Sequence, residues 1–212
     1  MAETYHFSSE QLIRTCPLPK SMFSHKSRES LTITASRIEP LSSLLKRNKK
    51  HLPYSIMEIL IESIGRQLHQ LEMENKAISS FNLDDITVFY ANDTSSSIHF
   101  AITNEDKIHE IDDGHQLTIS APYQKEYTTP TTKNIAFHSP EFKEFISKKT
   151  IPYTLHFKSG YYSFGLLCVY CYVSRNKDPT EKELAPIINT KIYWFLRWAL
   201  HENPSERRYI CV

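Results

Sequence analysis

Glycine is scarce in this chain, with only 4 among 212 residues. A loop that wraps a phosphate group needs glycine, because the backbone approaches phosphate closely only where no Cβ atom is in the way. This scarcity argues against nucleotide-binding folds of the Rossmann and P-loop types. An excess of one charge is also lacking, since 25 basic residues balance 24 acidic ones to a net charge of +1. We therefore expect no nucleic acid among the partners.

Long apolar segments are lacking too. Residues 1–20 are polar and contain no apolar core of a signal peptide. No stretch approaches the roughly eighteen apolar residues of a membrane-spanning helix. We therefore predict an intracellular, cytoplasmic protein with no membrane span and with reduced thiols. Hydrophobic residues still make up 40% of the chain and aromatic residues 12%, which is enough for a folded core.

Two of the four cysteines, Cys168 and Cys171, form a Cys-x-x-Cys motif. A zinc site would need a second ligand pair at a matching spacing, and a redox motif would need a helix N-terminus. The chain offers neither, because both cysteines stand inside the apolar run 161–173. The histidines show no ligand spacing beside a cysteine or carboxylate. We therefore expect buried structural cysteines, no metal site and no cofactor.

Hydrophobic periodicity locates the secondary structure. Apolar residues recur at every third or fourth position from 53 to 73, which predicts a long buried helix. β-Branched and aromatic residues at 86–90 and 98–102, separated by a turn at 92–97, predict a β-hairpin. The other predicted elements are a strand at 31–35, a helix at 41–47, strand pieces at 107–111 and 116–119, and helices starting at 139, at 161–173 and at 180–201.

The same pass along the chain predicts its organisation. Residues 1–29 are expected to form an irregular N-terminal segment, with a peripheral strand as the alternative. Residues 30–212 contain no linker and no repeat, so we expect them to form one domain. The order of the elements predicts an α+β fold that is predominantly helical and carries a small β-hairpin.

Three motifs in the second half of the chain occur in the order of a known family. Residues 137–141 read Phe-His-Ser-Pro-Glu, residues 159–167 read Ser-Gly-Tyr-Tyr-Ser-Phe-Gly-Leu-Leu, and residues 200–207 read Leu-His-Glu-Asn-Pro-Ser-Glu-Arg. They resemble the Ala-Pro-Glu segment, the start of the central helix and the Asp-Pro-x-x-Arg segment of protein kinases. The chain is thus similar to a kinase C-terminal lobe. This resemblance implies a structural ion pair between Glu141 and Arg207.

The resemblance also implies that the catalytic residues are missing. Residues 78–86 take the place of the His-Arg-Asp-x-x-x-x-Asn loop. The position of the catalytic base falls on Ser80, whose neutral hydroxyl takes up no proton at neutral pH. The lysine position falls on Asn82, the metal-binding asparagine on Asp85 and the Asp-Phe-Gly aspartate on Ile102. These degenerate positions predict that the protein is not an enzyme.

Two further departures from the family agree with this prediction. Gly160 stands where the family has an aspartate that braces the catalytic loop. Residues 1–29 are too few for the small N-terminal lobe, which would supply the glycine-rich lid and the phosphate-binding lysine. The resemblance therefore implies a kinase C-terminal lobe that stands without its small lobe.

The function that the resemblance implies is a catalytically inactive, kinase-like domain that binds a protein partner. The expected partner surface is the groove between the hairpin, the loop 78–86 and the former activation loop. One alternative is a structural subunit of a large assembly, such as a virion or a cytoskeletal array, that reuses the kinase fold. Another is a pseudokinase that is completed by a second chain and binds nucleotide.

Overall fold

A computed structural model describes residues 2–48, 51–91, 97–120, 135–173 and 181–209 of the protein. Helices account for 44% and strands for 26% of the structure, and the strands form five small sheets. The protein therefore has a mixed α/β fold, and the prediction of a predominantly helical domain is wrong. Several strands of two to five residues lie in polar segments and pair with distant partners, so no alternating pattern marks them in the sequence.

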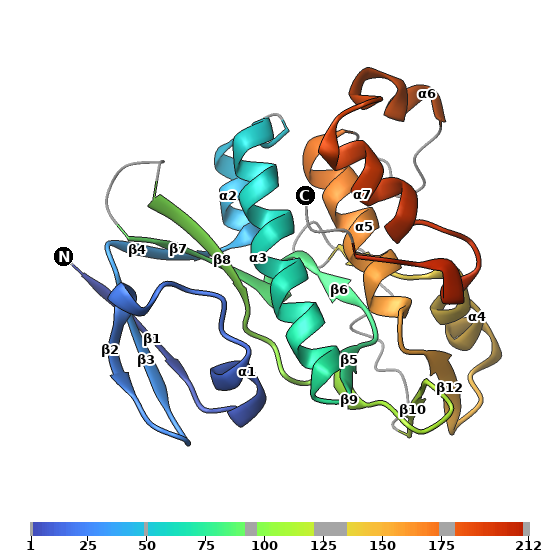
Figure 1. The fold of residues 1–212 in the computed structure, drawn as a ribbon, viewed down its shortest axis with the longest axis horizontal. Coiled ribbons are helices and arrows are strands. Elements are labelled where there is room, and N and C mark those ends of the chain that lie inside the picture. The colour runs from blue at the N-terminus through green and yellow to red at the C-terminus, as the bar shows by residue number, and fades with distance from the viewer. Residues whose placement is uncertain (1, 49–50, 92–96, 121–134, 174–180, 210–212) are drawn as a thin grey trace.

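The N-terminal segment is ordered. It forms β1 (Glu3–Phe7), α1 (Glu10–Arg14), the 3-10 turn η1 (Lys20–Met22), β2 (Phe23–Lys26) and β3 (Leu31–Ala35). The strands make an antiparallel sheet in the order β1-β3-β2, drawn in blue in Figure 1. The expectation of irregular structure in residues 1–29 is therefore wrong for these elements. Because β3 pairs with both β1 and β2, the sheet joins residues on the two sides of position 29.

A second three-stranded sheet follows, and a long helix packs against it. Its strands are β4 (Arg37–Pro40), β7 (Ile86–Tyr90) and β8 (Ile98–Ile102), in the order β4-β7-β8. The predicted hairpin of β7 and β8 is confirmed, and the turn predicted at 92–97 lies outside the described residues except for Ser97. The predicted helices are confirmed as α2 (Leu41–Arg47) and α3 (Tyr54–Met73), and α3 packs on β8.

The rest of the chain adds short strand pairs and helices. The antiparallel pairs are β5 (Lys76–Ile78) with β9 (Ile108–Glu110), β6 (Phe81–Asn82) with β11 (Ala136–Phe137), and β10 (Gln116–Ile119) with β12 (Tyr153–His156). The helices are α4 (Pro140–Lys148), α5 (Ser159–Tyr172), α6 (Glu181–Leu184) and α7 (Lys191–Ala199), and the 3-10 turns are η2 (Leu83–Asp85), η5 (Ala185–Ile187) and η6 (Pro204–Glu206). The three helical regions predicted after residue 139 are confirmed.

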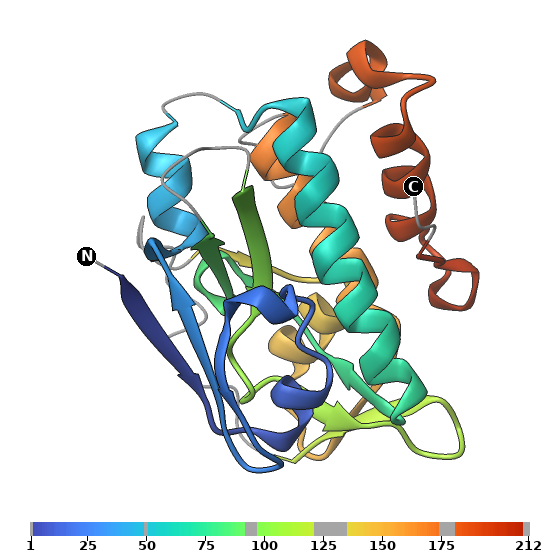
Figure 2. The ribbon, with the colours of Figure 1, turned by 60° about the vertical axis from the view of Figure 1, so that its left-hand side comes forward.

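Helix α5 lies at the centre of this half of the molecule. It contacts both α3 and α7, and Figure 2 shows it behind α3. Cys168 and Cys171 are completely buried in it, so the prediction of buried cysteines is confirmed. Burial raises the pKa of the Cys168 thiol, which keeps it protonated and unreactive. Within the described residues, no helix combines the length and the apolar character needed to cross a membrane.

Aromatic rings join the N-terminal sheet to the second sheet. Phe89 of β7 is fully buried, and its ring centroid lies 5.6 Å from that of Tyr5 and 6.4 Å from that of Phe7, both on β1. Such ring pairs stabilise a fold by more than the burial of their apolar area alone. The two sheets therefore share one hydrophobic core, which includes Phe7 and Phe89.

Replacing Phe89 by Ala should destabilise the protein and loosen the N-terminal sheet. We expect Phe89→Ala to lower the free energy of unfolding by about 3–5 kcal/mol, because it leaves a cavity between the two sheets. Denaturant unfolding measures the loss, and amide hydrogen exchange in β1 and β3 should become faster. The control Met73→Ala removes a side chain that is 73% exposed and should change stability by less than about 0.5 kcal/mol. Equal effects of the two substitutions would contradict the shared core.

Candidate functional site

The loop 78–86 is part of the protein core. β5 leads into it, β6 pairs it with β11, and η2 carries it into β7. Ser80 lies in the turn between β5 and β6 and is 2% exposed. A hydroxyl at this depth is out of reach of a substrate. The position that the sequence assigns to the catalytic base is thus buried as well as neutral.

The carboxylate of Asp85 is the polar centre of the loop. Its Oδ2 accepts hydrogen bonds from the backbone N–H of Asn82 at 2.5 Å and from Lys107 Nζ at 2.5 Å. Its Oδ1 accepts a hydrogen bond from Asn104 Nδ2 at 2.8 Å. Asp85 is 4% exposed, and a charge at this depth is tolerated only when it is paired and hydrogen-bonded. Three donors of the protein itself therefore already bind this carboxylate.

Lys107, just before β9, supplies the compensating charge. Its side chain is as deeply buried as that of Asp85. Burial lowers the pKa of Lys107, and the neighbouring carboxylate of Asp85 opposes that shift. A metal ion at Asp85 would have to displace this ammonium group. In the part of the chain that the structure describes, no three His, Cys, Asp or Glu side chains are placed to hold a metal ion together.

Ile102 is paired with Ile86, the residue after Asp85, in the hairpin of β7 and β8. It is the last residue of β8, is fully buried, and donates its backbone N–H to Oε1 of Gln67 at 2.8 Å. After this strand, the backbone N–H of Thr103 donates to the backbone carbonyl of Asp85 at 2.9 Å, and the side-chain amide of Asn104 donates to the Asp85 carboxylate.

Gln67 and Lys107 are residues that the sequence reasoning missed. Gln67 is a fully buried polar side chain on α3, and both of its amide atoms contact the backbone of Ile102. It therefore fixes the end of β8, from which the chain turns toward Asp85. A glutamine inside the apolar stripe of α3 was the available signal, because a buried amide needs specific partners. Lys107 carries no comparable signal.

A serine and a histidine also meet at the edge of the loop. His109 Nε2 lies 3.2 Å from the hydroxyl oxygen of Ser79. Burial lowers the pKa of His109, which favours its neutral form. Ser79 is 3% exposed, so this hydroxyl does not face a substrate either. The contact joins β9 to the loop.

The first turns of α5 hold the loop from the other side. Gly160 is packed so closely that a Cβ atom there would lie 2.3 Å from the carbonyl oxygen of Ile78. One turn later, the hydroxyl oxygen of Ser163 accepts the backbone N–H of Phe81 at 2.6 Å and donates to the carbonyl of Phe137 at 2.5 Å. Ser163 therefore braces the loop where position 160 has no space for a side chain. The sequence reasoning missed this role.

The structure brings Glu141 and Arg207 together. Arg207 Nη1 contacts Glu141 Oε1, and Nη2 lies 3.0 Å from Oε2, so the two groups meet in a bidentate pair. Arg207 is fully buried, with its Nε donating to the carbonyl of His201 at 2.9 Å and its guanidinium 4.8 Å from the ring centre of Tyr162. The pair ties α4 to the segment that follows α7.

Ser159 at the start of α5 completes this arrangement. Its hydroxyl donates to Glu141 Oε1 at 2.7 Å. Burial alone would raise the pKa of Glu141, but the hydrogen bonds from Arg207 and Ser159 and the charge of Arg207 outweigh it and lower that pKa. Glu141 is therefore ionised throughout the neutral range.

Comparison with known proteins supports the fold at a distance. No protein-family model matches the chain, and no curated protein matches its sequence. Among solved structures, the twitchin kinase region of C. elegans (Fn31-NL-kin-CRD-Ig26) is similar to this chain with a TM-score of 0.55 at 10% sequence identity. The match covers 98% of this chain and 39% of that chain. The protein thus has a kinase-like fold, and at this identity the likeness concerns the fold alone.

Removing Lys107 should be costly because it leaves a buried charge without a partner. We expect Lys107→Met to lower the free energy of unfolding by about 3–5 kcal/mol. Adding Asp85→Asn should recover part of this loss, since no unpaired charge then remains. Denaturant unfolding of both single variants and the double variant gives the coupling energy. The control is Lys76→Met, whose partner Glu110 has an 80% exposed side chain, and it should cost at most about 1 kcal/mol. Equal costs at Lys107 and Lys76 would contradict the role of Asp85.

Glu141 should make the free energy of unfolding depend on pH in the acidic range. Because its folded-state pKa is depressed, its contribution is present above the ordinary glutamate value of 4.5 and is lost as the pH falls through the folded-state pKa. Glu141→Gln should cost about 3–5 kcal/mol at pH 7, and this difference from the wild type should shrink below about pH 4.5. Unfolding curves across this pH range measure it. Glu144→Gln on the same helix, where the pair with Lys148 is exposed, should give a small difference. A constant difference at Glu141 would refute the linkage.

Proposed function

We propose that the protein is a kinase-like domain without catalytic activity and that it works as a protein-interaction module. The observation that carries this proposal is the environment of Asp85. Active kinases hold magnesium with an aspartate and an asparagine at the corresponding place. Here the carboxylate is bonded to the ammonium of Lys107 and to the amide of Asn104. An internal cation thus neutralises the carboxylate that a metal ion would need.

Two other features support the absence of phosphoryl transfer. Ser80 is both neutral and buried, so no group at this position accepts a proton from a substrate. The N-terminal sheet contains no glycine, because the first glycine of the chain is Gly65 in α3. A lid that closes over phosphates depends on glycine. These two features support the proposal of a domain that does not transfer phosphoryl groups.

Exposed apolar side chains support the second half of the proposal. Ile188 and Trp194 are about half exposed, at 50% and 49%, and both lie at or next to α7. Exposed apolar side chains are candidates for contacts with another protein. The groove first expected from the resemblance includes residues 121–134, which lie outside the described residues. The surface near α7 is therefore the better supported place for a partner.

The nucleotide test separates this proposal from a kinase-like protein that binds ATP. We expect the melting temperature to be the same with and without ATP and magnesium, because no group around Asp85 is free to hold them. A ligand at a hundred times its dissociation constant would stabilise the protein by about 2.7 kcal/mol, which thermal unfolding detects easily. An active kinase measured in parallel is the control. A magnesium-dependent rise that disappears in Asp85→Asn would contradict the proposed function.

A further inference from the structure

Helix α7 turns one side to the core and the opposite side to solvent. Its buried side chains recur at every third or fourth position and are Ile192, Phe195, Leu196 and Ala199. Trp194 and Arg197 stand on the opposite side, and Trp194 is 49% exposed. Figure 2 shows α7, drawn in red, at one edge of the molecule. The exposed side of α7 is therefore open to a partner.

Indole rings and guanidinium groups lie next to one another on this side. Trp194 and Trp198 are four positions apart, so they are neighbours along the helix surface. Arg197 is exposed beside them, and the guanidinium of Arg208 lies 5.4 Å from the ring centre of Trp198. Tryptophan and arginine are enriched among the residues that dominate the energy of protein interfaces. We call Trp194, Arg197, Trp198 and Arg208 the outer face of α7.

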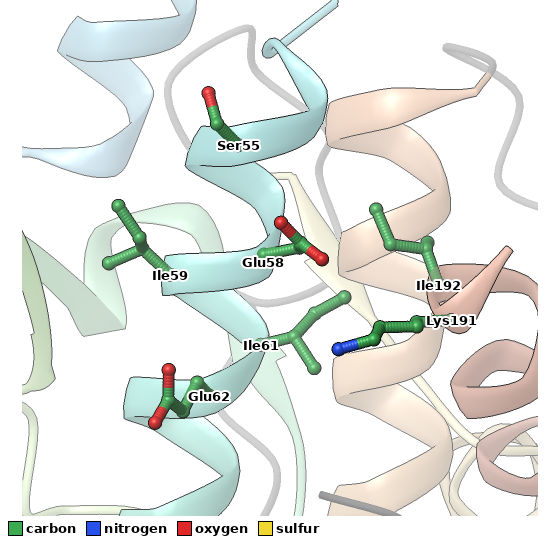
Figure 3. Close-up of a pocket in the computed structure, with 7 residues that line it drawn as sticks. All are labelled: Ser55, Glu58, Ile59, Ile61, Glu62, Lys191 and Ile192. Carbon is green, nitrogen blue, oxygen red and sulfur yellow. The ribbon is translucent and has the colours of Figure 1, made fainter. Parts of the chain in front are cut away.

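Lys191, at the start of α7, belongs to a different surface. Figure 3 shows its side chain pointing toward Ile61 of α3, in a hollow of about 410 Å³ that Glu58 and Glu62 also line. Glu62 is already paired with Arg66. One glutamate and one lysine then remain in the lining, so the hollow has no excess charge that would select a ligand. Lys191 is not counted as part of the outer face for this reason.

The two cations of the outer face lack an anionic partner within the described residues. Helix α7 itself contains no aspartate or glutamate. The acidic residues nearest in the sequence are Glu202 and Glu206, both exposed, and neither lies within ion-pair distance of Arg197 or Arg208. An anionic group from outside would therefore meet two available guanidinium groups, whereas a cationic group would be repelled.

The number of cations and the packing of α7 indicate the class of partner. Nucleic acid binding draws its affinity from contacts with many phosphates, and the outer face offers two cations. A helix that attaches to a membrane inserts its apolar side into lipid, but the apolar side of α7 is buried and packs on α5. A protein segment that combines a carboxylate with an apolar side chain needs a cation and an indole ring. The outer face supplies both.

We propose that the outer face of α7 binds an acidic segment of a partner protein, in which an apolar residue stands beside aspartate or glutamate. The carboxylates of the segment meet Arg197 and Arg208, and the apolar residue packs on the indole ring of Trp194. This proposal rests on the proposed function as an interaction module and names the chemistry of its partner. The guanidinium of Arg208 already lies against Trp198, which limits the freedom that it loses on binding.

Selection from a displayed library of random peptides tests the proposal on the full chain. We expect peptides selected on the wild type to be enriched in an acidic residue beside an apolar one. The same selection on the Arg197→Gln, Arg208→Gln double variant should lose the acidic residue. No enrichment on the wild type, or the same enrichment on the double variant, would overturn the proposal.

The matched control removes two arginines at the other end of the molecule. It carries Arg14→Gln and Arg28→Gln, whose side chains are 54% and 82% exposed and both contact Glu10. Exposed ion pairs of this kind contribute at most about 1 kcal/mol to stability. The net charge of the control equals that of the double variant, so a general loss of charge would affect both equally. We expect the control to select the same peptides as the wild type.

Fluorescence anisotropy of the most enriched peptide gives the magnitude. Its dissociation constant should rise roughly tenfold in the double variant and by a similar factor in Trp194→Ala, while the control variant matches the wild type. Trp194 is half exposed, so its replacement should leave the fold intact, and the melting temperature checks this. An unchanged dissociation constant in both variants would refute the site.

Two further probes test the class of partner. They are a single-stranded oligonucleotide and vesicles of phosphatidylcholine with phosphatidylserine. Binding of either probe that the double variant abolishes, without selection of acidic peptides, would overturn the assignment to a protein segment. A magnesium-dependent shift with ATP would defeat the proposed function, whereas the peptide selection decides the outer face independently. Failure of the selection without a nucleotide shift would remove this site and leave the non-catalytic assignment standing.

Discussion

The carboxylate of Asp85 has three donors around it, one from the loop 78–86 and two from the connection between β8 and β9. Asn82 belongs to β6, Asn104 follows β8, and Lys107 precedes β9. An uncompensated buried charge is costly, so the loop, the end of the hairpin and the approach to β9 must be in place together. In the proposed function, the same ion pair involves the residue that the resemblance assigns to the magnesium-binding asparagine. One interaction thus links the stability of this region to the argument for a non-catalytic role.

Polar links around the first turns of α5 give the rest of the region its shape. Ser159 contacts Glu141, Gly160 lets the backbone of Ile78 approach, and Ser163 bridges the loop to β11. The remainder of this helix is almost entirely apolar and buried. Its polar atoms are therefore concentrated where the loop and the pair of Glu141 with Arg207 meet. This distribution explains why the fold can keep the geometry of the loop although an aspartate at position 160 would not fit.

Sequence patterns predicted the parts of the fold that repeat over many residues. The stripe of α3 spans twenty residues and the apolar run of α5 fourteen, so their periods were visible. β6 and β11 have two residues each and exist only because they pair with one another, which no local pattern shows. The same limit applies at Asp85, because the hairpin register and not a local pattern brings the amide of Asn104 to its carboxylate. Glu141 and Arg207 were found because each belongs to a short local motif, whereas Lys107 does not.

The ammonium group of Lys107 beside Asp85 has a consequence for regulation by nucleotide. A ligand changes the balance between two conformations only by binding one of them more tightly than the other. If Lys107 permanently satisfies Asp85, nucleotide and magnesium have no such preference to act on, and the proposed partner binding is constitutive. Helix α3 is fixed to the segment that follows α7 by a hydrogen bond between Tyr209 and Ile61. The hydroxyl of Tyr209 donates to the carbonyl of Ile61 at 2.7 Å, while its ring fills the space beside Gly65. The choice of a protein partner would then depend on the surface of the folded domain and not on a switch driven by nucleotide.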